Sequence, residues 1–225
     1  EWEEPDDSDP WASIGYWGDH QIIYLLKLLE FSEQVSPGWI ANNLGSNEFV
    51  FADVPYEIKS FAELERDPNN SINFNFVKNE TIQIRVSKYG ADGKLVHGRD
   101  GKIVHAQLIE KLLIPLLIKL SNFVPAGGIW MNTQRPEWND ANNALAGFGL
   151  SVVTTGYLNR YIEFLSNILP DSPVEYELYE SIINLISELN DVFANFSNAD
   201  LGDDGKRYVA LNALGISGQK YRECI

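Results

Sequence analysis

The chain has 225 residues, 44% of them hydrophobic and 22% charged, a composition typical of one globular domain with a sizeable core. Its formal net charge of −15 argues against nucleic acid or an anionic membrane as a partner, because a phosphate surface attracts basic proteins. No apolar run reaches the roughly 18–20 residues that a membrane span requires, and a single cysteine, Cys224, excludes an internal disulfide.

Both ends of the sequence suggest a piece of a longer polypeptide. The chain opens with the acidic, proline-containing run EWEEPDDSDPW, which predicts an irregular lead-in. It stops at KYRECI, inside what looks like a new amphipathic segment. We therefore expect residues 1–225 to form a single-domain fragment whose partners include the remainder of its own parent chain.

The first quarter of the chain predicts a helix followed by irregular structure. Apolar residues recur at helical spacing in Gln21–Val35, with Asp19 where an N-cap belongs and Pro37-Gly38 as the stop. Three weaker elements follow: a short helix at Trp39–Leu44, an extended segment at Glu48–Tyr56, and at most one helical turn at Ser60–Arg66.

The pattern changes at residues 72–104. Apolar residues there alternate with polar ones in INFNFV, TIQIRVSKY, KLVHG and KIV, which is the period of a β-strand. Asp92-Gly93 and Asp100-Gly101 are hairpin-turn signals. We expect a small antiparallel β insertion near 72–104.

The second half predicts longer helices. His105–Phe123 is apolar on most sides, which is typical of a buried helix, and its interior Pro115 should kink it. Helical periodicity returns in Leu150–Leu169, in Ser172–Phe196, and from Arg207 to Gly215, where a last helix begins. The fold class predicted from the residues is mainly α with one small β insertion.

Chemistry is concentrated between two of these helices, in Pro125–Leu150. The segment is longer than most helix connectors and carries Trp130, Arg135, Trp138 and several amides. Indole faces stack on sugar rings, and amides pair with hydroxyl groups. We therefore expect a loop-borne binding site for a neutral ligand such as a carbohydrate.

The tetrapeptide Glu137–Asp140 holds the candidate acids. Cleavage of a glycosidic bond needs a carboxylic acid that protonates the leaving oxygen, and apolar surroundings keep such an acid protonated near neutral pH. Glu137 and Asp140 are the candidate catalytic residues, with Trp138 and Asn139 as substrate contacts. In the alternative interpretation, Asp140 only caps a helix that begins at Ala141, and Trp138 is a packing residue.

A second cluster lies at Tyr16–Gln21, where two aromatic residues precede Asp-His-Gln. Trp17, Asp19 and His20 are candidate sugar contacts; the alternative is that Asp19 is simply a helix cap and His20 a surface residue. No Cys/His or HExxH arrangement predicts a metal site. The run Asp200–Gly205 lacks EF-hand spacing and favours a solvated acidic loop.

The order of these pieces resembles the catalytic domain of inverting disaccharide phosphorylases, such as cellobiose and chitobiose phosphorylases. The segments that carry the resemblance are GDHQIIY at 18–24, FADVPY at 51–56 and EWNDANN at 137–143. The resemblance covers most of residues 15–170. It implies part or most of an (α/α)₆ toroid of helical hairpins, with Asp140 as general acid and Trp138 in the donor subsite.

The departures from that family concern the approach to the acid. Glu137 stands where the family has Asp, Ala141 where it has Gly, and MNTQRP replaces a glycine-rich approach. The insertion near 72–104 has no counterpart that we recognise, and the phosphate-binding part would lie beyond Ile225. Phosphorolysis and hydrolysis therefore both stay open.

These expectations define a fragment of a carbohydrate-active enzyme that cleaves a disaccharide or oligosaccharide with inversion. It needs no cofactor and no metal; inorganic phosphate is the co-substrate in the phosphorolytic case. Inversion with water requires a second carboxylate, which Glu137 is too near in sequence to be assumed to supply. The alternative from another class is a non-catalytic carbohydrate-binding or scaffold domain of the same fold.

Overall fold

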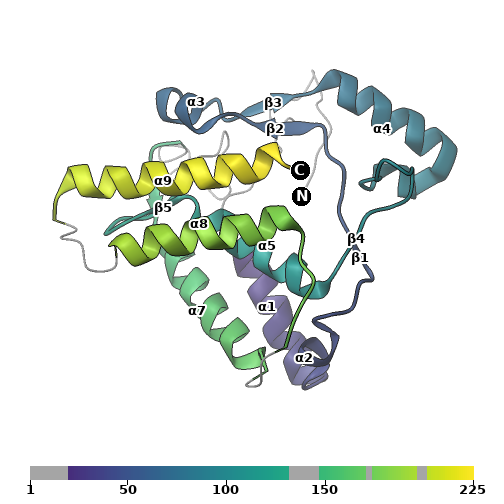
Figure 1. Ribbon diagram of the computed structural model, residues 1–225, viewed down its shortest axis with the longest axis horizontal. Coiled ribbons are helices and arrows are strands. Elements are labelled where there is room, and N and C mark those ends of the chain that lie inside the picture. Colours follow the sequence, from purple (N-terminus) through teal and green to yellow (C-terminus); the bar gives the residue numbers. More distant parts are fainter. Residues whose placement is uncertain (1–19, 132–146, 171–173, 197–201) are drawn as a thin grey trace.

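A computed structural model describes residues 20–131, 147–170, 174–196 and 202–225. Within these ranges the chain is mainly helical with small antiparallel sheets, as the sequence predicts (Figure 1). The helices are α1 His20–Val35, α2 Trp39–Asn43, α3 Phe61–Arg66, α4 Phe76–Tyr89, the 3₁₀ helix η1 Gly90–Lys94, α5 Leu108–Leu120, α7 Val152–Ile168, α8 Glu180–Phe196 and α9 Asp204–Glu223.

The strands are short and pair antiparallel in three places. β1 (Phe49–Val50) pairs with β4 (His105–Ala106), and β2 (Tyr56–Ile58) pairs with β3 (Ile72–Phe74). A three-stranded sheet in the order β5-β6-β7 joins Phe123–Val124, Gly128–Trp130 and Leu150–Ser151. This last sheet is not predictable from the sequence, because strands of two or three residues are too short to show an apolar period.

Helix α5 lies at the centre of the helical body (Figure 1). Leu108, Ile109, Leu112 and Leu116 pack into a core shared with α1, α2 and α7. Leu117 belongs to a second core shared with α8 and α9. This two-sided burial explains why the helix is apolar almost all round, as predicted for a buried helix.

Pro115 lies inside α5, as predicted, and deprives the helix of one backbone N–H donor. The fully buried Tyr161 of α7 donates its hydroxyl to the Leu112 carbonyl at 2.9 Å, in the turn that precedes the proline. Burial raises the pKa of this hydroxyl far above its ordinary value. Tyr161 thus joins α7 to α5 and satisfies a carbonyl in the region that Pro115 perturbs.

Glu110, in the first turn of α5, is only 2% exposed, and both of its carboxylate oxygens accept hydrogen bonds. Oε2 accepts the backbone N–H of Gln107 at 2.9 Å in a capping box, and Oε1 accepts the N–H of Tyr179 at 2.9 Å. The hydroxyl of Tyr179 donates to the His105 carbonyl at 2.8 Å. These bonds fasten the segment before α8 to the start of α5.

The start predicted for the helix at Ser172–Phe196 is wrong. The sequence pattern places the start of a helix at Ser172, whereas α8 begins at Glu180. Residues 174–179 form no regular secondary structure, and Tyr176 and Leu178 pack on the core beside α5. Their apolar spacing continues that of α8, so periodicity alone could not separate the two.

The predicted β insertion near 72–104 is wrong for its middle part, because Phe76–Tyr89 is helix α4. The alternation of TIQIRV suggested a strand, yet Ile84 is 63% exposed and only Ile82 of that run is buried. Asn75 caps the helix by accepting the N–H of Lys78 at 2.9 Å, and Gly90 with φ 65° ends it. These start and stop signals were present in the sequence and outweigh the alternation.

One of the two predicted turns has another role. Gly93 lies in η1, where a Cβ atom would come within 2.4 Å of the backbone of Arg85 and Val86, so glycine allows η1 to pack against α4. The turn at Asp100-Gly101 is confirmed: Gly98 donates to the Lys102 carbonyl at 2.8 Å, and His97 bridges to Ile103.

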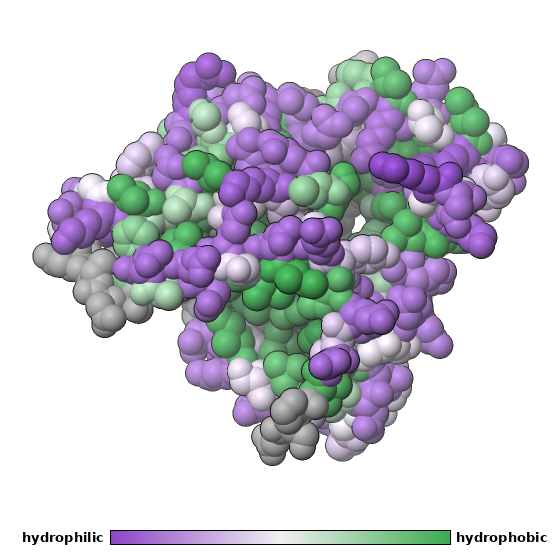
Figure 2. Space-filling view, viewed as in Figure 1, coloured by the Kyte–Doolittle hydropathy of each residue, from purple (hydrophilic) through white to green (hydrophobic). Residues whose placement is uncertain are grey.

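Apolar side chains also reach the surface. Tyr24, Leu28, Phe31 and Val35 form an exposed stripe on α1 at helical spacing. Figure 2 shows apolar atoms gathered in a recess below α8, between this helix and α2, while the outer faces of α8 and α9 are largely polar. None of the described helices is long and apolar enough to cross a bilayer.

Removing the Glu110 carboxylate should destabilise the fold. We expect Glu110→Ala to lower the free energy of unfolding by about 2–4 kcal/mol, because two partly buried backbone N–H groups lose the buried carboxylate that accepts from them. Chemical denaturation measures this loss. The matched control is Glu163→Ala on the exposed side of α7, with an expected change within about 0.5 kcal/mol; equal losses for both variants would contradict the role of Glu110.

The buried tyrosines predict instability in alkali. Burial and the nearby Glu110 carboxylate raise the pKa of Tyr221 from 10.0 to about 12. Because the folded state holds this proton more tightly than the unfolded chain, its stabilising effect is complete below pH 10 and is lost between pH 10 and about 12. Tyr221→Phe should therefore flatten the decline of unfolding free energy over that range, whereas Tyr208→Phe, at an exposed ring, should not.

Candidate functional site

Most of the predicted site residues lie outside the described residues. These are the candidate acids and most of the candidate sugar contacts: Glu137, Asp140, Trp17, Asp19, Arg135, Trp138 and Asn139. The backbone of His20 begins α1, and its side chain is likewise outside what the structure describes. Trp130 is the one predicted site residue whose surroundings are described in full.

The structure does describe the two ends of the segment that carries the candidate acids. Met131 and Gly147 flank residues 132–146, and the N–H of Gly147 donates to the Met131 carbonyl at 2.6 Å. The N–H of Met131 in turn donates to the Gly149 carbonyl at 2.9 Å. The β6–β7 pairing, with Trp130 opposite Leu150, continues this ladder. The segment therefore leaves and re-enters the fold at one place.

Trp130 has a structural role where residues 132–146 leave and re-enter the fold. We call this place, formed by β6, β7, Met131 and Gly147, the base of the segment. The indole Nε1–H of Trp130 donates to the Gly147 carbonyl at 2.9 Å, and its ring meets the Phe61 ring edge-on at 6.1 Å. Its backbone N–H donates to the Asn122 carbonyl at 2.9 Å, next to the end of α5. The single donor of the indole is thus already engaged by the protein, which leaves only part of the ring surface for a ligand.

Glycine makes the closure of the base sterically feasible. Gly147 has φ 81°, and a Cβ atom there would lie 2.2 Å from the Asn69 side chain and 2.9 Å from the Pro68 carbonyl carbon. Gly128 has φ 143°, and its Cβ would lie 3.0 Å from the Ser151 carbonyl oxygen. Both positions favour glycine for conformation and for space. The base is therefore rigidly packed on neighbouring backbone.

Contacts of Phe61 extend this rigidity to the last helix. Its backbone N–H donates to the Gln219 side chain at 2.7 Å, and its ring lies where a Cβ on Gly215 would be, 2.1 Å from the nearest ring atom. Helices α3 and α9 thus pack closely behind Trp130. The candidate segment is carried by elements that are themselves part of the fold.

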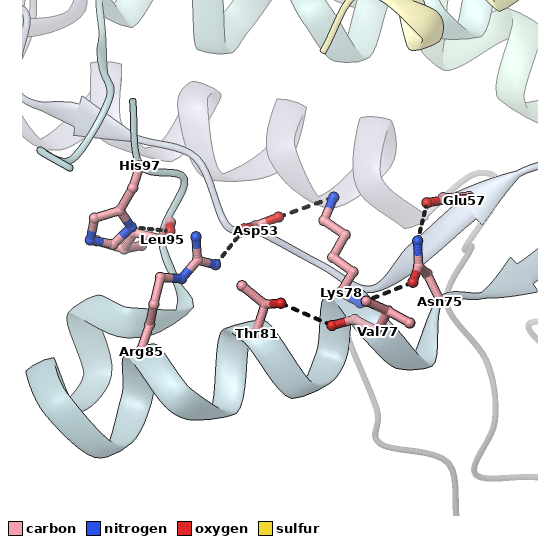
Figure 3. Close-up of polar contacts among 9 residues, drawn as sticks. All are labelled: Asp53, Glu57, Asn75, Val77, Lys78, Thr81, Arg85, Leu95 and His97. Atoms are coloured by element: carbon pink, nitrogen blue, oxygen red, sulfur yellow. Dashed lines mark hydrogen bonds and ion pairs between the residues drawn. The ribbon is translucent and has the colours of Figure 1, made fainter. Parts of the chain in front are cut away.

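The motif FADVPY at 51–56 is occupied by structural contacts. Asp53 lies between β1 and β2, and its carboxylate pairs with Arg85 and with Lys78, the latter at 3.1 Å (Figure 3). Its N–H donates to the Lys94 carbonyl at 2.8 Å. The Pro55 carbonyl accepts the N–H of Asn75 at 2.7 Å. Within the described residues, this motif fastens α4 and η1 to the rest of the chain.

Sequence reasoning missed an open hollow of about 470 Å³ beside α4. Its lining combines two imidazoles, a phenol, an ammonium and a carboxylate with small and apolar groups: Tyr89, Asp92, His97, Gly101, Lys102, Ile103 and His105. No motif joins these residues. The signal that could have found them is the concentration of basic residues and histidines in this part of the chain.

Neither a search for metal ligands nor comparison with known proteins assigns a function to these residues. No group of three or more His, Cys, Asp or Glu residues in the described ranges is arranged to hold a metal ion. No protein-family model matches the sequence, and no curated protein aligns with it significantly. The candidate site therefore depends on the residues themselves.

Adding a methyl group at the base should disturb the candidate site. We expect Gly147→Ala to lower the free energy of unfolding by about 1–3 kcal/mol, because φ 81° is strained for alanine and Asn69 and Pro68 leave no space. Thermal unfolding tests this expectation.

Gly156, inside α7, provides the matched control because a Cβ there meets nothing within 4 Å. Gly156→Ala should stabilise the protein by about 0.5–1 kcal/mol through helix propensity. A Gly147→Ala protein as stable as the wild type would show that the base tolerates a side chain.

Proposed function

We propose that this chain is part of a carbohydrate-active enzyme that cleaves a glycosidic bond with inversion. Asp140 would donate its proton to the glycosidic oxygen while water or phosphate attacks the anomeric carbon from the opposite face. The bond between the anomeric carbon and the glycosidic oxygen breaks, and its electron pair stays on that oxygen, which takes the proton of Asp140. A lone pair of the nucleophile forms the new bond, and in hydrolysis the attacking water gives its proton to a second carboxylate. Glu137 is the second carboxylate of the segment.

The observation that carries this proposal is that Met131 and Gly147, the residues on either side of 132–146, are hydrogen-bonded to each other. A loop with catalytic groups functions when a rigid scaffold fixes its ends. Here the hydrogen bond between Gly147 and Met131 and the packing of Trp130 on Phe61 fix both ends. A 15-residue segment rich in carboxylate, indole and amide groups is thereby presented from one point.

The order of motifs supports the same activity. GDHQIIY leads into α1, FADVPY spans the connection from β1 to β2, and EWNDANN follows β6. The family that this order resembles acts on disaccharides by inversion. The substrate class proposed here is accordingly a disaccharide or oligosaccharide, with no cofactor and with phosphate as co-substrate in the phosphorolytic case.

The toroid is the finer part of the fold proposal. Helices α8 and α9 run antiparallel side by side, as the two members of a helical hairpin do (Figure 1). The exposed apolar stripe of α1 is a surface on which a further helix of the parent chain could pack. Helix α5 packs against helices on several sides, so in a toroid it would lie between neighbouring hairpins of the ring.

A specific observation favours a second candidate function. Asp53 of FADVPY and the indole N–H of Trp130 are both used in structural contacts. A non-catalytic carbohydrate-binding or scaffold domain would retain such contacts without needing an acid. It would bind a saccharide and leave its bonds intact.

Replacement of Asp140 separates these two functions. With cellobiose and N,N′-diacetylchitobiose as probes, we expect the wild type to release a monosaccharide product of inverted configuration. Asp140→Asn should lower kcat about 100-fold or more while saccharide binding persists, because an amide cannot deliver the proton. Product configuration by NMR and binding by calorimetry are the two measurements.

Asp191→Asn, on the exposed side of α8, makes the same charge change and should leave kcat as in the wild type. Activity that requires phosphate would identify a phosphorylase, and activity without it a hydrolase. Unchanged turnover in Asp140→Asn would remove Asp140 as the acid. Binding without turnover by the wild type would support the non-catalytic domain instead.

A further inference from the structure

Charge is unevenly distributed along this chain. Residues 76–105 contain six Lys or Arg and three Asp or Glu, a formal net charge of +3. The other 195 residues contain 11 basic and 29 acidic residues, a formal net charge of −18. Two of the three histidines, His97 and His105, also belong to this basic stretch.

The basic stretch folds together as an arm, defined here as residues 76–105. Helix α4 packs on η1, and the backbone then returns through the bridges from Ala52 to Leu95 and from His97 to Ile103. In Figure 1 this arm lies to one side of the body formed by α1, α5, α7, α8 and α9. A stretch of net positive charge thus lies beside the helical body.

The hollow described above lies within this arm. His97 is held on one wall: its Nδ1 donates to the Leu95 carbonyl at 2.8 Å (Figure 3). Its ring also stacks on the Tyr89 ring, with the centroids 6.0 Å apart. A carbonyl can only accept, so Nδ1 carries the proton and Nε2 of the neutral ring is an acceptor. The Lys88 ammonium lies 4.7 Å from the centroid of the Tyr89 ring and adds positive charge nearby.

The remaining polar groups of the hollow are available to a ligand. Lys102 is 84% exposed, and its nearest carboxylate, on Asp100, is 3.8 Å away, too far for a strong hydrogen bond. Within the described part of the chain, no hydrogen bond engages the His105 ring, the Asp92 carboxylate or the Tyr89 hydroxyl. The hollow therefore offers the Lys102 ammonium, the His105 ring and the Tyr89 hydroxyl as donors, and the Asp92 carboxylate as an acceptor.

This combination selects a ligand that is both anionic and hydroxylated. An oxyanion pairs with the Lys102 ammonium and accepts a hydrogen bond from the His105 ring, because charge-assisted hydrogen bonds are the strong ones. A bare anion would be repelled by Asp92, whereas a ligand hydroxyl can donate to that carboxylate. The volume of about 470 Å³ falls in the range of small-molecule sites.

We propose that the hollow between Tyr89, Asp92, Lys102 and His105 binds a polyhydroxylated oxyanion, such as a sugar acid or a sugar phosphate. Lys102 binds the carboxylate or phosphate, and Asp92 accepts the hydroxyl groups. This binding does not require glycosidic cleavage by Asp140, so either activity can fail without the other.

Calorimetric titration of the whole chain with four probes tests this assignment. Galacturonate and glucose 6-phosphate represent the two sources of the anion, glucose lacks the anion, and inorganic phosphate lacks the hydroxyls. We expect both sugar anions to bind about tenfold or more tightly than glucose, with an affinity that falls as salt is added. Binding of only one sugar anion would assign the site to its anion.

Lys102→Glu should weaken binding of the sugar anions about tenfold or more, because a charge-assisted hydrogen bond is replaced by repulsion. Lys220→Glu on α9 changes the net charge equally at a lysine paired with Glu188, and should leave the affinity nearly unchanged. Asp92→Asn should strengthen binding of inorganic phosphate. Because Lys102 and Asp92 are exposed, far-UV circular dichroism should show both variants folded.

Three results would overturn the proposal. Equal affinity for glucose and galacturonate would remove the anion requirement. Equal loss in Lys102→Glu and Lys220→Glu would reduce the effect to net charge. Absence of binding by both sugar anions would exclude the ligand class altogether.

Discussion

The helical body of the described fold depends on the burial of α5. A helix whose apolar residues point to nearly every side cannot rest on a single neighbour. It is stable only when helices cover it from more than one direction, and α1, α7, α8 and α9 do so. The two hydrophobic cores therefore share one 13-residue helix, α5, and both depend on its position.

Burying a helix so completely also buries polar groups. The hydrogen bonds that these groups need determine which segments pack against the helix. Glu110 can be buried because Gln107 and Tyr179 donate to it, and the second of these bonds fixes the segment that leads into α8. The carbonyl of Leu112, beside Pro115, is satisfied by Tyr161 from α7. Hydrogen bonds thus decide which neighbour lies where, while apolar contact supplies most of the stabilisation.

The elements that could be predicted from the sequence are those marked locally, by apolar periodicity or by residues that start and stop a helix. Helices α1 and α7 followed from the spacing of their apolar residues, and the buried α5 followed from being apolar on most sides. Helix α4 was missed because alternation in TIQIRV was weighted above the cap at Asn75 and the stop at Gly90. The β5-β6-β7 sheet could not be predicted at all, since its pairings join residues from 123 to 151 in strands too short for a pattern.

The same distinction holds for the candidate sites. A motif such as EWNDANN can be recognised because its residues are contiguous, and the structure adds only how Met131 and Gly147, which flank residues 132–146, are held. The hollow of the basic arm is assembled from residues 89–105 by α4, η1 and two bridges, so no local motif announces it.

Under the two proposals made above, charge would give the two sites different selectivity. The 195 residues outside the arm carry a formal net charge of −18, which repels anions over about 10 Å at 0.1 M salt, while the arm of charge +3 attracts them. A neutral saccharide is indifferent to that field and can reach the segment that follows β6. An anionic sugar is steered to the arm. Ligand charge, and with it the dependence on salt, is therefore what distinguishes binding at one site from binding at the other.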